Sequence, residues 1–189
     1  MVTQYYTATS LDGFLATPDD SLEWLFQLGD IDDTSYPEFI RAVGALAMGS
    51  TTYRWMLEHV IKADGDAPGD WPYRQPCWVF SSRPQRGVAG ADIRFVSGDV
   101  RPVHAAMRTA AGSRNVWLVG GGDLVGQFHD AGLLDEIIVQ IGSVTLGAGK
   151  PLLPRFIAFP PLRLTSARAV GPGFAELRYQ VPRPAAGAA

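Results

Sequence analysis

The chain has 189 residues, of which 47% are hydrophobic and 19% are charged, and its formal net charge is −3. These values are typical of a soluble globular protein with one sizeable core. The slight acidity argues against a nucleic-acid partner, which a basic face would normally recruit. One cysteine and three well-separated histidines predict no metal site. No apolar run approaches 18 residues, so we expect no membrane partner and a cytoplasmic location.

The first half of the chain alternates strand and helix patterns. Residues 2–9 are rich in β-branched and aromatic side chains and predict a strand. A loop punctuated by Gly and Pro follows, and loops of that length often carry function. A short helix is expected at 36–43, with Pro37 in its first turn. The apolar run 45–50 predicts a second strand, and residues 51–61 show a helical apolar face.

The second half begins with the same alternation and ends in strands. Patterns typical of strands occupy 77–82, 91–97 and 116–119, with helices at 100–110 and 123–131. Residues 135–146 predict a long strand, and two further strands pair around Gly171-Pro172-Gly173. We therefore expect a three-layer α/β/α fold whose central sheet is mixed and mostly parallel, with a C-terminal antiparallel hairpin. Residues 1–181 should form one domain, and 182–189 a flexible tail.

Two stretches share the order apolar run, small residues, helix: "ALAMGSTTYRWM" and "VWLVGGGDLVGQF". Such a turn exposes unpaired backbone N–H groups at the positive end of a helix, where a phosphate can bind. The alternative is that the glycines only make an economical turn. The dinucleotide fingerprint G-x-G-x-x-G fails because Val125 takes the place of its third glycine, and no P-loop lysine follows. Two such turns in one small domain favour a dinucleotide.

Four stretches in order resemble the dihydrofolate reductase superfamily, and most closely its branch that contains the reductase domain of bacterial riboflavin biosynthesis. They are "TATSLDGFLA", "LAMGSTTYRWM", "VFSSRP" and "VWLVGGGDLVGQFHDAGLLDEIIVQIGSVTLGAGKPLLP". The likeness runs from about Val2 to Val181. It implies a dihydrofolate reductase-like fold and an NADPH-dependent reductase that transfers hydride to a small pteridine- or pyrimidine-like heterocycle.

The resemblance also implies where the cofactor would bind. The residues bordering the nicotinamide would be Ala8, Leu15 and Ala16. One phosphate region would be held by Gly49, Ser50, Thr51 and Thr52, and the adenosine ribose would lie beside Ser81, Ser82 and Arg83. The pyrophosphate would be covered by Val119, Gly120, Gly121, Gly122, Asp123 and Leu124.

One position departs from the family pattern. The family usually has Arg directly after the glycine of the first turn, where this chain has Ser50. An arginine there would bind a 2′-phosphate by charge-assisted hydrogen bonds that serine cannot reproduce. NADH therefore stays open as an alternative to NADPH, with Arg83 or Arg54 as substitute cations.

Candidates for the chemistry are few. The folate enzymes place a carboxylate in the substrate pocket, and Asp33, 16 positions before Gly49, matches its spacing. It could hydrogen-bond ring nitrogens and help protonate the substrate, or it could simply favour a helix N-terminus. Asp12 is a substrate candidate, but Asp-Gly is also a strong turn dipeptide. Trp24 could line the pocket or anchor a loop, and Thr145 could face the cleft or be a plain strand residue.

A second class of function fits the same residues. Ser50 and the absence of an unambiguous catalytic acid agree with a nucleotide- or small-molecule-binding module that keeps the fold without turnover. Members of the riboflavin-type branch often pair. The resemblance thus also implies a homodimer, and the segment from Leu146-Gly147 to the prolines that follow is a candidate for its interface.

Overall fold

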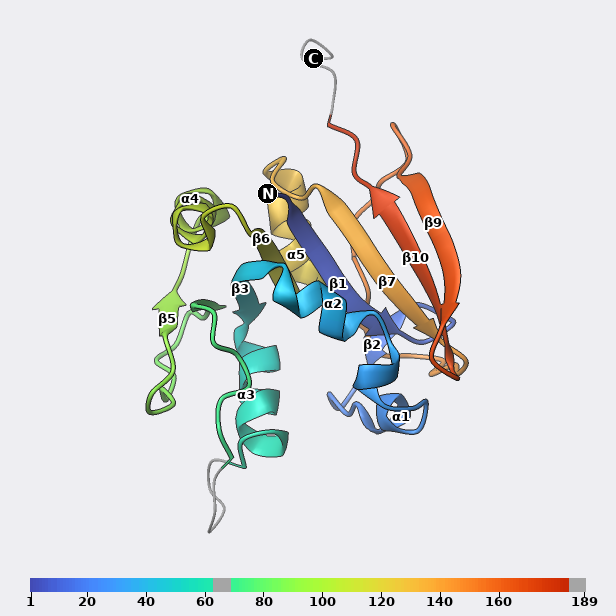
Figure 1. Cartoon of the computed structure of the whole chain (residues 1–189), viewed down its shortest axis with the longest axis horizontal. Coiled ribbons are helices and arrows are strands. Elements are labelled where there is room, and N and C mark those ends of the chain that lie inside the picture. The colour runs from blue at the N-terminus through green and yellow to red at the C-terminus, as the bar shows by residue number, and fades with distance from the viewer. Residues whose placement is uncertain (63–68, 184–189) are drawn as a thin grey trace.

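The computed structural model of the chain describes residues 1–62 and 69–183. Its largest feature is an eight-stranded sheet (Figure 1). In spatial order the strands are β5 (Ile93–Val96), β4 (Cys77–Phe80), β3 (Val43–Gly49), β6 (Asn115–Gly120), β1 (Thr3–Thr9), β7 (Glu136–Gly142), β10 (Phe174–Gln180) and β9 (Arg163–Val170).

The six strands from β5 to β7 run parallel, and the last two reverse direction. β10 pairs antiparallel with both β7 and β9, while the other neighbouring pairs are parallel. The mixed, mostly parallel sheet and its C-terminal hairpin confirm the predicted fold class.

Helices cover both faces of the parallel strands (Figure 1). The helices are α1 (Glu23–Phe26), η1 (Ile31–Asp33, a 3₁₀ turn), α2 (Tyr36–Arg41), α3 (Ser50–His59), α4 (Val100–Ala111) and α5 (Gly122–Asp130). One apolar core packs α2 and α3 against the sheet, and the other packs α4 and α5 against its opposite face. A small second sheet joins β2 (Phe14–Ala16) to β8 (Lys150–Pro151).

Neighbouring residues of β1 serve the two cores in turn. Tyr5 is fully buried on the α4–α5 side, and Tyr6 stacks on Phe39 of α2 with ring centroids 4.3 Å apart. This alternation is what a strand buried on both faces requires. Phe128 of α5 is also fully buried, and burying such a side chain contributes about 1.5–3 kcal/mol.

Most element boundaries differ from the predicted ones by one or two residues, and the largest difference is at the end of β7. β7 ends at Gly142, four residues before the predicted end at Leu146, although the N–H of Ser143 still donates to the Gly173 carbonyl in the register of the β7–β10 pair. At the C-terminus, Arg183 forms an ion pair with Asp135 at 2.9 Å, and the rest of the predicted tail, 184–189, lies outside the described residues, as do residues 63–68. Within the described part of the chain, no helix is long and apolar enough to cross a membrane.

Candidate functional site

The chain leaves two adjacent strands in opposite directions. From β3 it passes through α3 to β4, toward the edge of the sheet at β5. From β6 it passes through α5 to β7, toward the opposite edge at β9. Helices α3 and α5 also lie on opposite faces. Such a reversal is the topological switch point of an α/β sheet, and ligands bind there, outside the carboxyl ends of the strands.

The N-termini of α3 and α5 lie side by side at this switch point. Gly49 is the N-cap residue of α3 and Gly121 that of α5, both with extended backbone and neither with a side-chain capping hydrogen bond. A Cβ atom added to Gly49 would lie 3.8 Å from the backbone nitrogen of Gly121. The unpaired N–H groups and positive dipole ends of two helices therefore come together, which favours an extended anion.

The three consecutive glycines have three different roles. Gly120 has φ +145°, which side chains rarely adopt, and its peptide bond to Gly121 is cis. A Cβ on Gly121 would meet nothing within 4 Å, so its backbone is open to a ligand. A Cβ on Gly122 would lie 2.5 Å from the carbonyl oxygens of Pro151 and Leu152, so this glycine permits close packing. Gly120 thus makes the turn, Gly122 permits close packing, and Gly121 leaves its backbone open.

The other residues expected near the phosphates surround these helix ends. Thr52 Oγ1 lies 3.9 Å from the position of a Cβ on Gly120, which places the first turn of α3 beside the end of β6. Ser50 and Thr51 precede it in the same turn. Phe80, the last residue of β4, pairs with Gly49, so the loop that continues from it lies beside the start of α3. That loop carries Ser81, Ser82 and Arg83.

Side chains on the first turn of α5 face away from an incoming ligand or are already engaged. Leu124 is buried in the core, and Val119 packs on the opposite core. Asp123 accepts a hydrogen bond from Arg155 at 3.1 Å. What α5 can offer a ligand is therefore its backbone N–H groups.

The loop after β1 is joined to the start of α5 through the small sheet. Ala8 lies near the end of β1, and Leu15 and Ala16 belong to β2, which pairs with β8. Leu152, directly after β8, donates its N–H to the Gly13 carbonyl at 3.0 Å and places its own carbonyl against Gly122. Backbone contacts through β8 therefore link the residues expected beside the nicotinamide to those expected beside the pyrophosphate.

Asp12 contacts the loop after β7, which contains Thr145. The Asp12 carboxylate accepts the N–H groups of Leu146 and Gly147, the latter at 2.7 Å. A hydrogen bond from Ser10, followed by these backbone donors, holds the pKa of Asp12 below its ordinary value. Asp12 therefore fixes the loop after β7, and Thr145 lies exposed in that loop.

Trp24 is buried on α1 with its ring against Gly142. Its Nε1 donor has no hydrogen-bond partner within the described residues. A buried donor without a partner is uncommon, because desolvating it costs free energy.

Asp33 lies apart from the helix N-termini. It ends the η1 turn, which Asp30 caps, and its side chain is exposed. Its backbone oxygen lies 3.6 Å from the position of a Cβ on Gly171, in the β9–β10 turn. The switch point between β3 and β6 is several strands away.

The sequence reasoning missed Glu176 of β10, whose carboxylate is fully buried on the face that α2 covers. Burial opposes its ionisation, but hydrogen bonds from Ser35, Arg178, Gln140 and Arg168 outweigh that cost and hold the pKa of Glu176 below its ordinary value. A signal was present: strand alternation puts Glu176 on the same face as Arg178. A charged residue flanked in this way inside a strand can be buried because it is paired.

Metal binding has no candidate group within the described residues. Among residues 1–62 and 69–183, no cluster of three or more His, Cys, Asp and Glu side chains could hold a metal ion. The described part of the site thus consists of helix ends, glycines and hydroxyl side chains.

Comparisons with known proteins place this arrangement in a family. The fold is that of dihydrofolate reductase-like proteins: a dihydrofolate reductase from Enterococcus faecalis, solved as a complex with NADP(H), superposes with a TM-score of 0.60 at 13% identity, over 95% of each chain. Residues 3–175 match the model of the RibD C-terminal domain. The chain therefore belongs to the RibD C-terminal domain family.

Two relatives cover nearly the whole chain. The uncharacterized protein YwjB of Bacillus subtilis is 31% identical over 170 residues, which is 89% of this chain and 92% of the relative. A Shewanella sp. PV-4 protein, whose name provisionally assigns it to riboflavin biosynthesis, is 26% identical with a TM-score of 0.76, over 97% of this chain and 100% of that one.

Proposed function

We propose that the protein is an NADPH-dependent reductase that transfers hydride to a small pteridine- or pyrimidine-like heterocycle. One observation carries the proposal: the uncapped N-termini of α3 and α5 lie side by side, and the backbone of Gly121 between them is open. Membership of the RibD C-terminal domain family and a structural neighbour solved with NADP(H) support it.

The residues at the switch point fit such a cofactor, which would supply the hydride. The N–H groups that begin α5 would hold the pyrophosphate, and Ser50, Thr51 and Thr52 would add hydroxyl donors from α3. Ala8, Leu15 and Ala16 would border the nicotinamide and keep water from it.

Discrimination between NADPH and NADH would fall to Arg83. Ser50 provides no charge for a 2′-phosphate, whereas Arg83 is exposed in the loop directly after β4. Its backbone is fixed because its N–H donates to Ser81 Oγ and its carbonyl accepts from the same hydroxyl. A guanidinium on this fixed loop could bind a phosphate in the bidentate manner that favours arginine.

Thermal unfolding with each dinucleotide tests the cofactor. A ligand at about 100 times its Kd stabilises the folded state by about 2.7 kcal/mol, so NADPH should raise the melting temperature and NADH should raise it less. Loss of NADPH absorbance with added pterins or pyrimidines would then demonstrate turnover. If neither dinucleotide changes the melting temperature, the proposal is wrong.

A binding module without turnover is the second candidate, and the position of Asp33 favours it. The carboxylate expected beneath the heterocycle is exposed instead, so the chain supplies no acid from that position. A melting shift with NADPH, combined with no oxidation of NADPH by any heterocycle tried, would support this candidate over the reductase.

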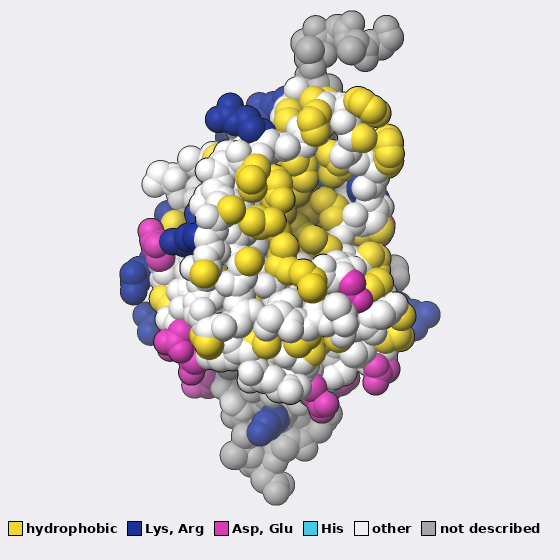
Figure 2. Space-filling model, turned by 90° about the vertical axis from the view of Figure 1, so that its right-hand side faces the viewer, with side chains coloured by type: hydrophobic (Ala, Val, Ile, Leu, Met, Phe, Trp, Pro, Cys, Tyr) yellow, Lys and Arg dark blue, Asp and Glu magenta, His cyan; other side chains and the backbone are white. Residues whose placement is uncertain are grey.

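We further propose that the protein forms a homodimer through its β9–β10 side. Figure 2 shows hydrophobic side chains gathered over a hollowed face on this side. Phe156 and Phe159 are 88% and 91% exposed, and Leu164 of β9 is also exposed. Exposed apolar patches of this kind mark protein interfaces. Sedimentation should give a dimer, and Phe156→Glu with Phe159→Glu should give a monomer that still binds NADPH.

A further inference from the structure

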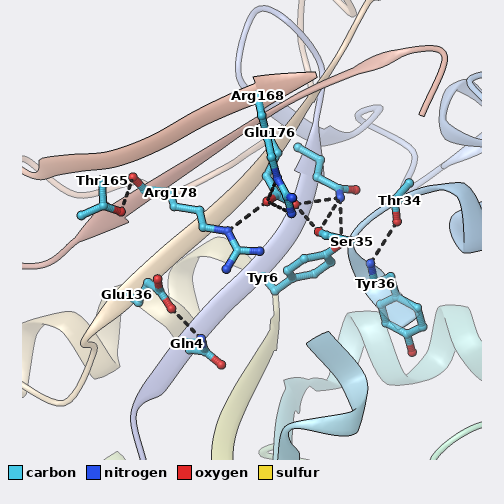
Figure 3. A network of polar contacts seen from close by, with 11 residues as sticks. Gln4, Tyr6, Thr34, Ser35, Tyr36, Glu136, Thr165, Arg168, Glu176 and Arg178 are labelled. Atoms are coloured by element: carbon cyan, nitrogen blue, oxygen red, sulfur yellow. Dashed lines mark hydrogen bonds and ion pairs between the residues drawn. The ribbon is translucent and has the colours of Figure 1, made fainter. Parts of the chain in front are cut away.

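A polar cluster joins β10, β7 and β1 to the segment before α2, on the face of the sheet that α2 covers (Figure 3). Its centre is the Glu176 carboxylate, which is fully buried. Oε1 of this carboxylate accepts hydrogen bonds from Arg168 and Arg178 at about 3 Å (2.9–3.1 Å). Oε2 accepts from Ser35 Oγ and, at 3.2 Å, from Gln140 Nε2.

The two arginines fix the direction of every hydrogen bond in the cluster. They hold Glu176 as a carboxylate, which can only accept. Ser35 must therefore donate its proton to Glu176, and Tyr6 must donate to Ser35 at 3.1 Å. Gln140 donates from Nε2 to the Tyr6 hydroxyl at 2.7 Å as well as to Glu176. The amide of Gln140 thus cannot turn over without placing its oxygen against a carboxylate.

This fixed orientation leaves the amide oxygen of Gln140 available. The hydrogen bonds of Gln140 within the described residues all run from Nε2, and none reaches Oε1. An unpaired side-chain oxygen is either buried or in contact with solvent, and Gln140 Oε1 is not one of the buried ones. It therefore reaches solvent. An acceptor of known orientation is therefore presented by an otherwise buried side chain.

The position of Gln140 connects the cluster with the nicotinamide side of the proposed site. Gln140 pairs with Ala8 of β1 and with Glu176 of β10 in one row across the sheet. Its contact with Tyr6 places it on the face that α2 covers, and Ala8, two residues after Tyr6, lies on that face too. Directly opposite residues on neighbouring strands have side chains about 5 Å apart.

A donor without a partner lies further along the same face. Gly142, two residues after Gln140, faces the buried ring of Trp24, whose ring atom lies 2.9 Å from the position of a Cβ on that glycine. Trp24 Nε1 has no partner within the described residues. Trp24 Nε1 is enclosed by the protein, whereas Gln140 Oε1 reaches solvent, so the acceptor that this part of the sheet offers to a ligand is Gln140 Oε1.

We propose that Gln140 selects the substrate, with its Oε1 accepting a ring N–H, and that Glu176 is the residue that positions Gln140. The substrate class is then a heterocycle with a ring N–H, such as the N–H that lies beside a carbonyl in an oxopyrimidine or oxopteridine ring. This inference rests on the proposed reductase function, because it places the ring beside the residue expected to border the nicotinamide.

The first experiment uses the unaltered protein and two probe rings. Lumazine carries N–H groups beside its carbonyls, and 1,3-dimethyllumazine carries methyl groups instead. With NADPH at saturation, lumazine should bind at least about tenfold more tightly, since a site built for a donor rejects an analogue that lacks it. Quenching of tryptophan fluorescence or calorimetry measures both constants. Equal affinities, or no binding of lumazine, would overturn the proposal.

Variants show whether the difference in affinity comes from the hydrogen bond or from the bulk of the methyl groups. Gln140→Leu should make the two rings bind equally. Glu176→Gln should reduce the ratio of the lumazine and 1,3-dimethyllumazine affinities several-fold, because the new amide can donate a hydrogen bond and so allows the Gln140 amide to turn over. Gln4→Leu is the matched control. Gln4 is a similarly buried glutamine on the same face that also donates to a glutamate, Glu136, at the other end of the sheet, and its loss should leave the ratio unchanged.

NADPH affinity, measured in each variant, keeps the two hypotheses distinct. It should be unchanged in Gln140→Leu and Glu176→Gln, so a lost ratio with retained NADPH binding supports the role of the cluster. A ratio that survives Gln140→Leu overturns the inference and leaves the reductase proposal intact. If NADPH binds to none of these proteins, including the unaltered one, the reductase proposal itself has failed.

Discussion

The N-terminus of α4 is capped by a side chain, whereas the N-termini of α3 and α5 are not. All three helices begin after the carboxyl end of a parallel strand. At α4, Asp99 occupies the N-cap position and its carboxylate accepts the N–H of Arg101 at 3.0 Å. At α3 and α5, the N-cap residues are Gly49 and Gly121, and no side chain caps either helix.

The difference indicates which helix N-termini are available to bind a ligand. Glycine at an N-cap costs a helix only about a few tenths of a kcal/mol relative to a capping side chain, so Gly49 and Gly121 leave the N–H groups of their helices unpaired at little cost in stability. The two uncapped ends are adjacent to each other, whereas the capped end follows β5, at the edge of the sheet. An anion bound between α3 and α5 would satisfy the donors that the chain leaves unpaired.

The largest expected effect comes from giving α5 the cap that α4 already has. Gly121 has φ −76° and ψ 173°, close to the extended N-cap backbone of Asp99, and its surroundings leave room for a side chain. In Gly121→Asp, a carboxylate would occupy and repel the place of the phosphates. NADPH affinity should fall at least about 100-fold, or about 2.7 kcal/mol, in a fluorescence titration.

Stability is the control for this variant. Asp is as good an N-cap as any residue. The unfolding free energy of Gly121→Asp without cofactor, measured by urea titration, should therefore stay within about 1 kcal/mol of the original. Gly121→Asn adds a similar cap without the charge and should lose less affinity. Retained NADPH binding in Gly121→Asp would refute the placement of the phosphates.

The second prediction separates two adjacent glycines. In Gly122→Ala, the new Cβ would lie 2.5 Å from two backbone carbonyl oxygens, those of Pro151 and Leu152. Backbone must move to accommodate it, and overpacking of this kind costs about 1–3 kcal/mol. In Gly121→Ala the Cβ meets nothing within 4 Å, so its unfolding free energy should change by less than about 0.5 kcal/mol. Equal destabilisation in urea unfolding would contradict this division of roles.

The third prediction concerns the charge at the start of α3. Ser50→Arg should tighten NADPH about tenfold, or about 1.4 kcal/mol, because a guanidinium binds the 2′-phosphate by charge-assisted hydrogen bonds. NADH lacks that phosphate, so its affinity should change little. Ser50→Gln, which is long but uncharged, is the control. The ratio of the two Kd values measures the effect, and a ratio that does not move would place the 2′-phosphate elsewhere.

The sequence was sufficient to predict the fold and the position of both glycine turns. The structure begins α3 at Ser50 and α5 at Gly122, each one residue before the predicted start, because glycine after an apolar run is a strong local signal for the turn. Local signals could not separate Gly121 from Gly122. That difference depends on Pro151 and Leu152, which are distant in sequence and pack on only one of the two glycines.

The buried carboxylate shows why the substrate side was harder to predict. Spacing alone favoured Asp33, but that residue ends a short exposed turn. Glu176 is buried because Arg168 and Ser35, from β9 and the segment before α2, meet it from two sides. Such pairing across strands depends on register, and the order β7-β10-β9 could not be read from any one of these segments.

The smallest expected effect on the cofactor comes from removing the cap of α4. Asp99→Ala should lower the unfolding free energy by about 1 kcal/mol, which corresponds to roughly 2–4 °C in melting temperature for a chain of this size. NADPH affinity should not change, because α4 follows the outermost strand of the sheet, β5, and its N–H groups serve the helix alone. Asp99→Asn, which keeps a capping oxygen, should recover most of the stability. A weaker Kd for NADPH in Asp99→Ala would mean that the cofactor reaches α4, and the contrast between capped and uncapped helix ends would no longer define the site.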